Sequence, residues 1–194
     1  MGEAPRGDGL TPVAVALANC WRVRGSPPAA LALQPEGQGA NPPAMAASLV
    51  EQGPWAGWKA WHARPEGRFV DGLGDGYYRD EPVNGGPGVL CAIETARRHG
   101  NGLGFLHGGF LMAFVDVTMF ATIRHMLDQS AGVTLQCSTD FIGAGAIGKV
   151  LEGRGHIVKE TGKMVWVAGT LTQDDGAHLV CQWHGILRKV PRNR

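Results

Sequence analysis

The sequence predicts an α+β fold in which one long apolar helix is enclosed by a strongly twisted antiparallel sheet. An apolar segment that begins near Gly108 and ends near Asp128 has the length of a helix of about five turns. Four strand-like segments follow it, and their short links favour antiparallel neighbours because parallel strands need long crossovers. A helix that is apolar on nearly every face must be buried, so we expect the sheet to curve around it.

Residues 1–44 are predicted to be a disordered extension. They hold seven of the twelve prolines, among alanines and glycines with no sustained periodicity. Such a stretch cannot bury enough apolar surface to offset the entropy of ordering it. A more globular composition begins at Met45, which suggests that translation starts there; an intact mass of the native protein that begins at Met1 would contradict this.

The segment 45–68 is predicted to be helical. Trp55, Trp58 and Trp61 recur every three residues, which suits one face of a short helix. A stripe of this kind is typical of core packing or of an interface, and we assign it no chemical role.

The strand candidates are short and are separated by turn signals rich in glycine, asparagine and aspartate. They lie at 77–79, 89–95, 133–141, 149–159, 164–173 and 178–189. We therefore expect one globular domain at 69–190, followed by a short tail at 191–194.

Composition excludes several classes of protein. Lysine and arginine number 18 against 17 acidic residues, so no field of the whole chain attracts nucleic acid or anionic lipid. The four cysteines are far apart and form no zinc or disulfide framework, which favours reduced thiols in a cytoplasm. The longest apolar run, 110–123, is shorter than the roughly 20 residues of a membrane span. We expect a soluble cytoplasmic protein with no nucleic-acid or membrane partner.

Three motifs resemble known sites, but the residues around them do not match what those sites require. The stretch 143–149 has the GxxxxGK spacing of a phosphate loop, but Val150 replaces the hydroxyl residue that would hold magnesium, and a strand follows. Gly102 and Gly104 begin a GxGxxG motif in which His107 occupies the third glycine. No serine lies in GxSxG, which excludes a serine esterase.

Asp116 is the anomaly of the apolar helix. Its neighbours three, four and seven positions away are all apolar residues or glycine, and an unpartnered buried carboxylate would be costly. One explanation is structural: the carboxylate bonds a backbone amide or pairs across an interface. The other is functional: a partly desolvated carboxylate with a raised pKa acts as a base or nucleophile.

The loop before the helix supplies the complementary group. Gly108 is expected at the helix N-terminus, where free N–H groups and the positive end of the dipole meet, and the missing side chain lets a substrate carbonyl approach closely. Gly108 and Asp116 are eight residues apart, about 12 Å along one helix. If both act on one carbonyl, they must come from two chains of a two-fold dimer.

These residues together resemble the PaaI-like thioesterases of the hotdog-fold superfamily. The resemblance rests on Asn101 six residues before the His107-Gly108-Gly109 motif, on Asp116 nine residues after its histidine, and on the strand opened by Gly132-Val133-Thr134. It covers about residues 69–190.

The resemblance implies hydrolysis of an acyl-CoA thioester by a homodimer or a dimer of dimers, with no metal and no redox cofactor. The Gly108 N–H would polarise the carbonyl, and Asp116 would act as general base or nucleophile. Asn101 would place the water or the substrate, although as a residue type it is also a common turn former. His107 would support the loop, and Thr134 would orient the water or the acid.

Three cations are candidates for the phosphates of CoA: Arg154, Lys159 and Lys163. Exposed charges on strands more often face solvent alone. The acyl preference is not readable from the sequence.

Two other functions remain open. Hotdog domains include hydratases and dehydratases that use a catalytic histidine with an acid, for which only His107 is suitably placed. A non-catalytic acyl-CoA sensor would keep the pocket and tolerate the loss of Asp116.

Overall fold

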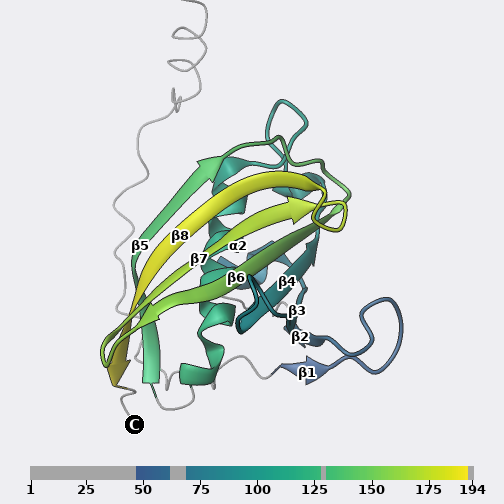
Figure 1. Cartoon of the computed structure of the whole chain (residues 1–194). Coiled ribbons are helices and arrows are strands. Elements are labelled where there is room, and N and C mark those ends of the chain that lie inside the picture. The colour runs from purple at the N-terminus through teal and green to yellow at the C-terminus, as the bar shows by residue number, and fades with distance from the viewer. Residues whose placement is uncertain (1–46, 62–68, 128–129, 192–194) are drawn as a thin grey trace, which may run out of the picture. The chain divides into compact units, whose positions relative to one another are not determined.

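The computed structural model describes residues 47–61, 69–127 and 130–191. Within them an antiparallel sheet of eight strands curves around one α-helix (Figure 1). This is the hotdog arrangement, and it confirms the predicted fold class. The expected extension at 1–44 lies outside the described residues.

From residue 76 onward the strands and the main helix follow the predicted order along the chain. The elements are β1 (Ser48–Leu49), β2 (Lys59–Trp61), η1 (Phe69–Leu73), β3 (Gly76–Asp80), β4 (Gly88–Glu94), η2 (Arg97–His99), α2 (Gly108–Thr122), η3 (Arg124–Met126), β5 (Ser130–Phe141), β6 (Val150–Glu160), β7 (Met164–Gln173) and β8 (His178–Pro191). The sheet order is β1-β2-β3-β4-β6-β7-β8-β5. The strand that follows the helix, β5, therefore lies at the opposite edge from β1, with β8 as its neighbour.

The helix α2 is shorter than predicted. It has 15 residues, about four turns, and the chain then tightens into the 3-10 turn η3 after Ile123. The predicted end at Asp128 lies outside the described residues. No helix in the described part of the chain is long and apolar enough to cross a membrane.

Glycines of β6 let the helix lie close to the sheet. A Cβ at Gly153 would collide with the Thr118 hydroxyl, and a Cβ at Gly155 with that of Thr122. Both hydroxyls are buried and are satisfied inside the helix, since Thr118 donates to the carbonyl of Phe114 at 2.9 Å and Thr122 to that of Thr118 at 2.7 Å. Part of the high glycine content therefore serves helix–sheet packing.

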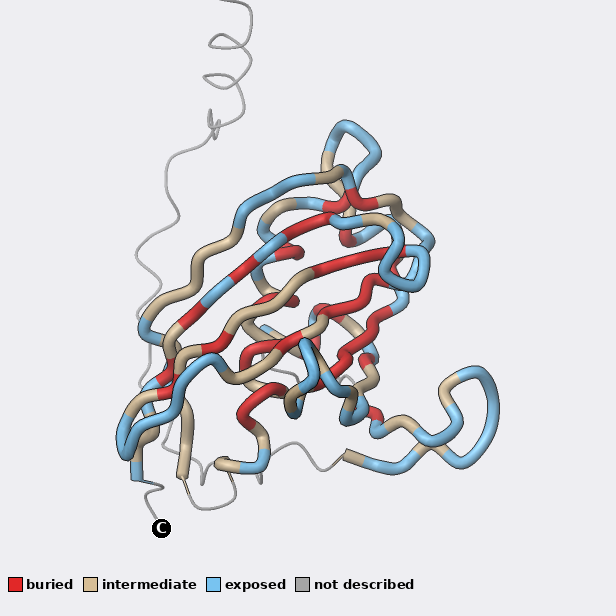
Figure 2. Tube along the Cα trace, in the orientation of Figure 1, coloured by how far each residue is buried: buried red, intermediate tan, exposed pale blue. Residues whose placement is uncertain are grey.

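The helix is buried on the sheet side and partly uncovered on the other. Phe114, Val115 and Met119 are fully buried in the core, and Figure 2 shows buried stretches along the central strands of the sheet. Met112 is 44% exposed and Asp116 is half-buried. The prediction that the whole helix is buried is therefore wrong for a single chain, because the sheet curves around only one side of it.

The predicted helix at 45–68 is not found in the described part of that segment. Residues 47–61 form a hairpin of β1 and β2 instead. Gly53 and Gly57 adopt positive φ values of 85° and 84°, which glycine tolerates and which let the chain reverse.

The three tryptophans consequently take different positions. Trp55 stacks on Tyr77 with ring centroids 4.3 Å apart, and the Arg79 guanidinium lies over Trp58 at 4.6 Å. Trp61 is buried in the core on β2. The three-residue spacing thus reflects a turn followed by a strand.

Candidate active site

Asp116 is held by a strand on one side of the helix. It lies in the third turn of α2, and the Thr134 hydroxyl on β5 donates a hydrogen bond to its Oδ1 at 2.7 Å. No bond to a backbone amide is found for this carboxylate among the described residues. The acid is therefore oriented by a side chain and remains half exposed.

Cys137 is a neighbour of Asp116 that the sequence analysis missed. Burial raises the pKa of its thiol, a hydrogen bond with Thr139 opposes that shift, and the charge of Asp116 adds to it. The thiol is therefore neutral beside the carboxylate. A β-bulge between Thr134 and Gln136 brings Cys137 to the helix-facing side, whereas regular alternation from Thr134 would have placed Gln136 there.

The first turn of α2 presents the Gly108 N–H. His107 is the N-cap, and its Nδ1 accepts a hydrogen bond from the Gly109 N–H at 2.9 Å. No hydrogen bond to the Gly108 N–H is found among the described residues. Phe141 lies beside it, 3.5 Å from where a Cβ on Gly108 would be. This donor at the positive end of the helix is available to an incoming oxygen.

Asn101 shapes the loop that leads into the helix. Its Oδ1 accepts hydrogen bonds from the N–H groups of Leu103 at 2.8 Å and Phe105 at 3.2 Å. The side chain is thus a turn former, as one of the two interpretations expected. Its amide nitrogen has no partner among the described residues and stays available to a ligand.

His99 fastens this loop and was not singled out from the sequence. It is buried, its Nδ1 accepts from the Ala96 N–H at 3.0 Å, and its Nε2 lies 2.9 Å from the Leu73 carbonyl. Its own carbonyl accepts from the His107 N–H at 2.8 Å. Burial lowers the pKa of His99, and the positive charge of Arg98 lowers it further, whereas the hydrogen bond to the Leu73 carbonyl raises it. Because the pKa is lowered overall, the ring is neutral, and the contact with the Leu73 carbonyl places its proton on Nε2.

The structure keeps the two halves of the predicted site apart within one chain. Asp116 and Thr134 lie together, whereas Asn101 and His107 lie near Gly108 at the start of the helix. Gly108 and Asp116 are on the same α2, about 12 Å apart along its axis.

A cavity of about 760 Å³ opens beside Asp116. Its apolar wall combines helix residues such as Val117 and Phe120 with Trp61 and Tyr78 from the strands β2 and β3. The volume is in the range of small-molecule sites. This wall was not predicted from the sequence, because residues 45–68 were expected to form a separate helix.

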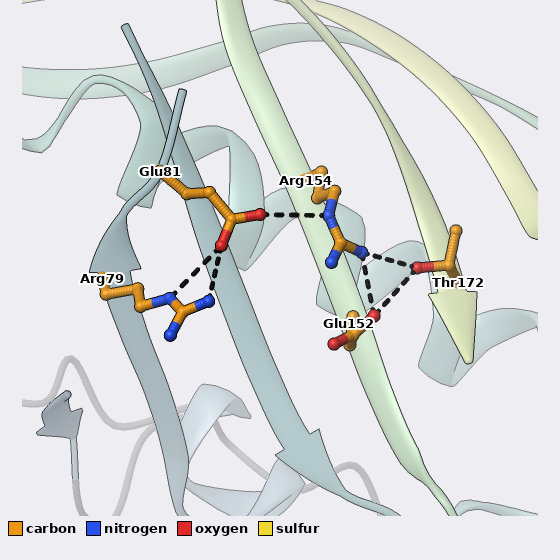
Figure 3. A network of polar contacts seen from close by, with 5 residues as sticks. All are labelled: Arg79, Glu81, Glu152, Arg154 and Thr172. Atoms are coloured by element: carbon orange, nitrogen blue, oxygen red, sulfur yellow. Dashed lines mark hydrogen bonds and ion pairs between the residues drawn. The ribbon is translucent and has the colours of Figure 1, made fainter. Parts of the chain in front are cut away.

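Arg154 occupies a different environment from the one expected for a phosphate ligand. Its side chain points away from α2, because the neighbouring glycines of β6 face the helix. It donates to Glu152 at 2.8 Å, to Thr172 at 3.0 Å and to Glu81 at 3.3 Å, and Glu81 also binds Arg79 (Figure 3). Burial lowers its pKa, but the hydrogen bond and charge of Glu152 and those of Glu81 outweigh that effect and raise it. Two carboxylates thus already compensate its charge.

The other two phosphate candidates are exposed. Lys159 lies near the end of β6, and Lys163 lies in the turn between β6 and β7. Among the described residues, no group of three or more potential metal ligands is found.

Comparisons with known proteins agree with the fold. Residues 103–180 match the family model of the thioesterase superfamily. The protein yhdA from Lactococcus lactis is 15% identical with a TM-score of 0.59, and the match covers 66% of this chain and 100% of that one. AziG from S. sahachiroi is 20% identical with a TM-score of 0.54, covering 65% and 98%.

A hypothetical thioesterase protein from Streptococcus pneumoniae TIGR4, solved with coenzyme A, is 24% identical with a TM-score of 0.50, covering 60% of this chain and 88% of its own. No curated protein sequence matches the chain. The family match and the shared fold confirm the resemblance to the hotdog-fold thioesterases.

Proposed function

We propose that this chain, a hotdog-fold protein with a thioesterase-superfamily match, hydrolyses acyl-CoA thioesters in a two-fold dimer. The observation that carries the proposal is the pairing of an oriented acid with an available backbone donor on one helix. Asp116 is held by Thr134, and the Gly108 N–H is unoccupied among the described residues. Thioester hydrolysis needs these two functions: a group that activates water and a donor that stabilises an oxyanion.

The dimer follows from the spacing along α2. One chain cannot direct both Gly108 and Asp116 at the same carbonyl, whereas two antiparallel helices would place Gly108 of one chain beside Asp116 of the other. The uncovered face of α2, which includes Met112 and Asp116, offers the contact surface for such a partner.

The proposed reaction begins with the thioester carbonyl oxygen accepting a hydrogen bond from the Gly108 N–H. Asp116 takes a proton from water as the water oxygen bonds the carbonyl carbon, and the resulting oxyanion stays on the Gly108 N–H. When the tetrahedral intermediate collapses, the C–S bond breaks and the CoA sulfur takes the proton that Asp116 removed from water, which restores the carboxylate. Direct attack by the Asp116 carboxylate would expel the CoA thiolate and give an anhydride, which water then cleaves to the free acid and the Asp116 carboxylate, with the same donor at the oxyanion.

Supporting groups complete the site in this proposal. Thr134 fixes one oxygen of the acid, and Asn101 directs its free amide nitrogen toward the water or the substrate. His107 holds the first turn of the helix through Gly109. The pneumococcal neighbour was solved with coenzyme A, which supports CoA as the carrier, and Lys159 and Lys163 are exposed cations available for its phosphates.

The testing experiment measures thiol release from a panel of acyl-CoAs. We expect turnover by the wild type and a loss of about 10² or more in kcat for Asp116→Asn, the scale of a lost general base. Binding of acyl-CoA without any release would overturn hydrolysis in favour of a sensor. Equal turnover by both proteins would remove Asp116 from the chemistry.

The oxyanion donor can be deleted without removing a side chain. Proline is tolerated at the first position of a helix and lacks the N–H, and His107 has φ −73° and ψ 134°, which suits a residue before proline. We expect Gly108→Pro to lower kcat by about 10². Gly108→Ala keeps the N–H, and its Cβ would make only ordinary contact with Phe141. A smaller loss of kcat for Gly108→Ala than for Gly108→Pro would therefore separate the donor from the effect of an added side chain.

A further inference from the structure

The cavity beside Asp116 extends from this acid to two positively charged side chains, Lys59 and Arg124. Asp116 and Phe120 on α2 and Arg124 at the start of η3 follow one another at four-residue spacing, and all three line the cavity. Arg124 is thus about 12 Å from Asp116 along the axis. The helix residues that line the cavity between these charged groups, Val117, Phe120 and Ala121, are apolar, and they separate a negative end of the cavity from a positive one.

Lys59 reaches the same positive end from the sheet. It lies directly opposite Tyr78 in the β2–β3 register, so both side chains are on the same face. The Arg124 guanidinium is 5.6 Å from the Tyr78 ring. Lys59, Tyr78 and Arg124 all line the cavity, which brings two cations to its far end.

The positive charges at this end of the cavity outnumber the negative ones. Arg124 pairs with Asp80 and donates to the Ala121 carbonyl at 2.8 Å. The Lys59 ammonium has no ion pair among the described residues. Two positive groups therefore face one carboxylate. Burial lowers the pKa of Arg124, with Tyr78 opposing the shift, so the guanidinium is partly desolvated and would gain from a further anion.

We propose that the acyl group hydrolysed here carries a carboxylate at its far end, which Lys59 and Arg124 bind. This inference rests on the proposed thioesterase function and names its substrate class, an ω-carboxyacyl thioester. The thioester carbonyl lies at Asp116, the methylene chain contacts Phe120 and Val117, and the carboxylate meets the cations. The reverse orientation would place the carboxylate of the acyl group beside Asp116, and the repulsion between the two negative charges disfavours it.

A phosphate of CoA offers the same anionic chemistry to the two cations. The wall between Asp116 and Arg124 favours the acyl carboxylate. Its helix residues Val117, Phe120 and Ala121 are apolar, and the pantetheine arm of CoA contains two amides whose burial there without partners would be costly. A methylene chain has no such groups to satisfy.

The test compares hexanoyl and adipyl thioesters, which have the same chain length and differ in the terminal carboxylate. Each is assayed on CoA and on N-acetylcysteamine, which has no phosphate. Lys59→Met removes the ammonium and keeps the length of the side chain. Lys149→Met is the matched control, because Lys149 pairs with Asp174 at 2.7 Å and does not line this cavity.

We expect the wild type to prefer adipyl over hexanoyl by about tenfold in kcat/KM on both carriers, the scale of one charge-assisted hydrogen bond. Lys59→Met should abolish that preference by lowering adipyl turnover alone, and Lys149→Met should leave it intact. Hydrolysis without preference for adipyl would overturn this inference and leave the proposed function standing. If Lys59→Met lowered kcat/KM for both adipyl-CoA and hexanoyl-CoA, but for neither N-acetylcysteamine thioester, the cations would bind a phosphate of CoA. That result would overturn the inference of an ω-carboxyacyl substrate. No hydrolysis of any thioester would overturn both proposals.

Discussion

The Thr134 hydroxyl lies 2.7 Å from Oδ1 of Asp116, so β5 fixes one carboxylate oxygen of a helix residue that lines the cavity. This contact joins the helix to the edge strand β5. It gives the acid a defined orientation, which a half-exposed carboxylate on a helix would otherwise lack.

Thr134→Ala is expected to lower kcat by about tenfold, less than Asp116→Asn, because the acid keeps its charge and loses one hydrogen bond. Thr134→Ser keeps the hydroxyl and should retain most of the activity. Steady-state kinetics of the three variants, with thermal unfolding to verify folding, check this. A serine variant as slow as the alanine variant would contradict the role of the hydroxyl.

Gly153→Ala is expected to lower the free energy of unfolding by about 1–3 kcal/mol. The added Cβ would collide with the buried Thr118 hydroxyl, so the helix must shift. Gly162→Ala is the control, since no atom lies within 4 Å of a Cβ there. Urea denaturation of both variants measures the difference, and equal stability would show that the helix has room to move away from β6.

His99 is expected to make folding sensitive to mild acid. Because its pKa is lowered in the folded protein, the unfolded chain binds the proton first as the pH falls below about 6.5. The stability that the neutral ring provides is therefore complete above that pH and decreases toward the folded pKa. Urea denaturation at pH 7.5 and 5.5 should show a smaller loss for His99→Gln than for the wild type, whereas an equal loss would assign the acid sensitivity to other groups.

The thiols are expected to react with a thiol reagent in an order set by burial. Burial raises the pKa of Cys91 to about 12 and that of Cys181 to about 11. Cys137 is only half-buried. Timed labelling of the native protein at pH 8, followed by peptide mass spectrometry, should modify Cys137 before the other two. Unfolded protein, in which the three react alike, is the control, and faster labelling of Cys91 would contradict the buried geometry.

Much of the sheet was predictable from the sequence because its strands carry local signals. The segment 164–173 was predicted with the bounds that the structure has, and 178–189 differs from β8 by two residues at its end. Short turns such as Asp174-Asp175-Gly176 fix where these strands stop, and all three residues adopt positive φ. The short links correctly predicted the antiparallel pairs β6–β7 and β7–β8. The link from β5 to β6 does not join neighbours, because β5 pairs with β8 instead.

The errors arose where distant contacts decide the conformation. Trp55 and Trp58 have helical spacing, yet stacking on Tyr77 and Arg79 stabilises a hairpin that no local pattern reveals. Cys137 was missed because a β-bulge changes which residues face the helix. In the site, the apolar neighbours of Asp116 identified the acid and the resemblance to thioesterases pointed to Thr134, which the structure joins to it. The cavity wall could not be predicted, because it depends on β2 and β3 reaching the helix.

The position of Gly108 and Asp116 at two points of one helix has a genetic consequence in a dimer of the proposed kind. A chain that carries Asp116→Asn still has a sound Gly108 donor, and a chain that carries Gly108→Pro still has a sound acid. Mixing the two inactive proteins under conditions of subunit exchange would create hybrid dimers in which one site recovers both wild-type groups and the other has neither. Two defective alleles would thus complement each other, to at most half of the wild-type activity per hybrid dimer.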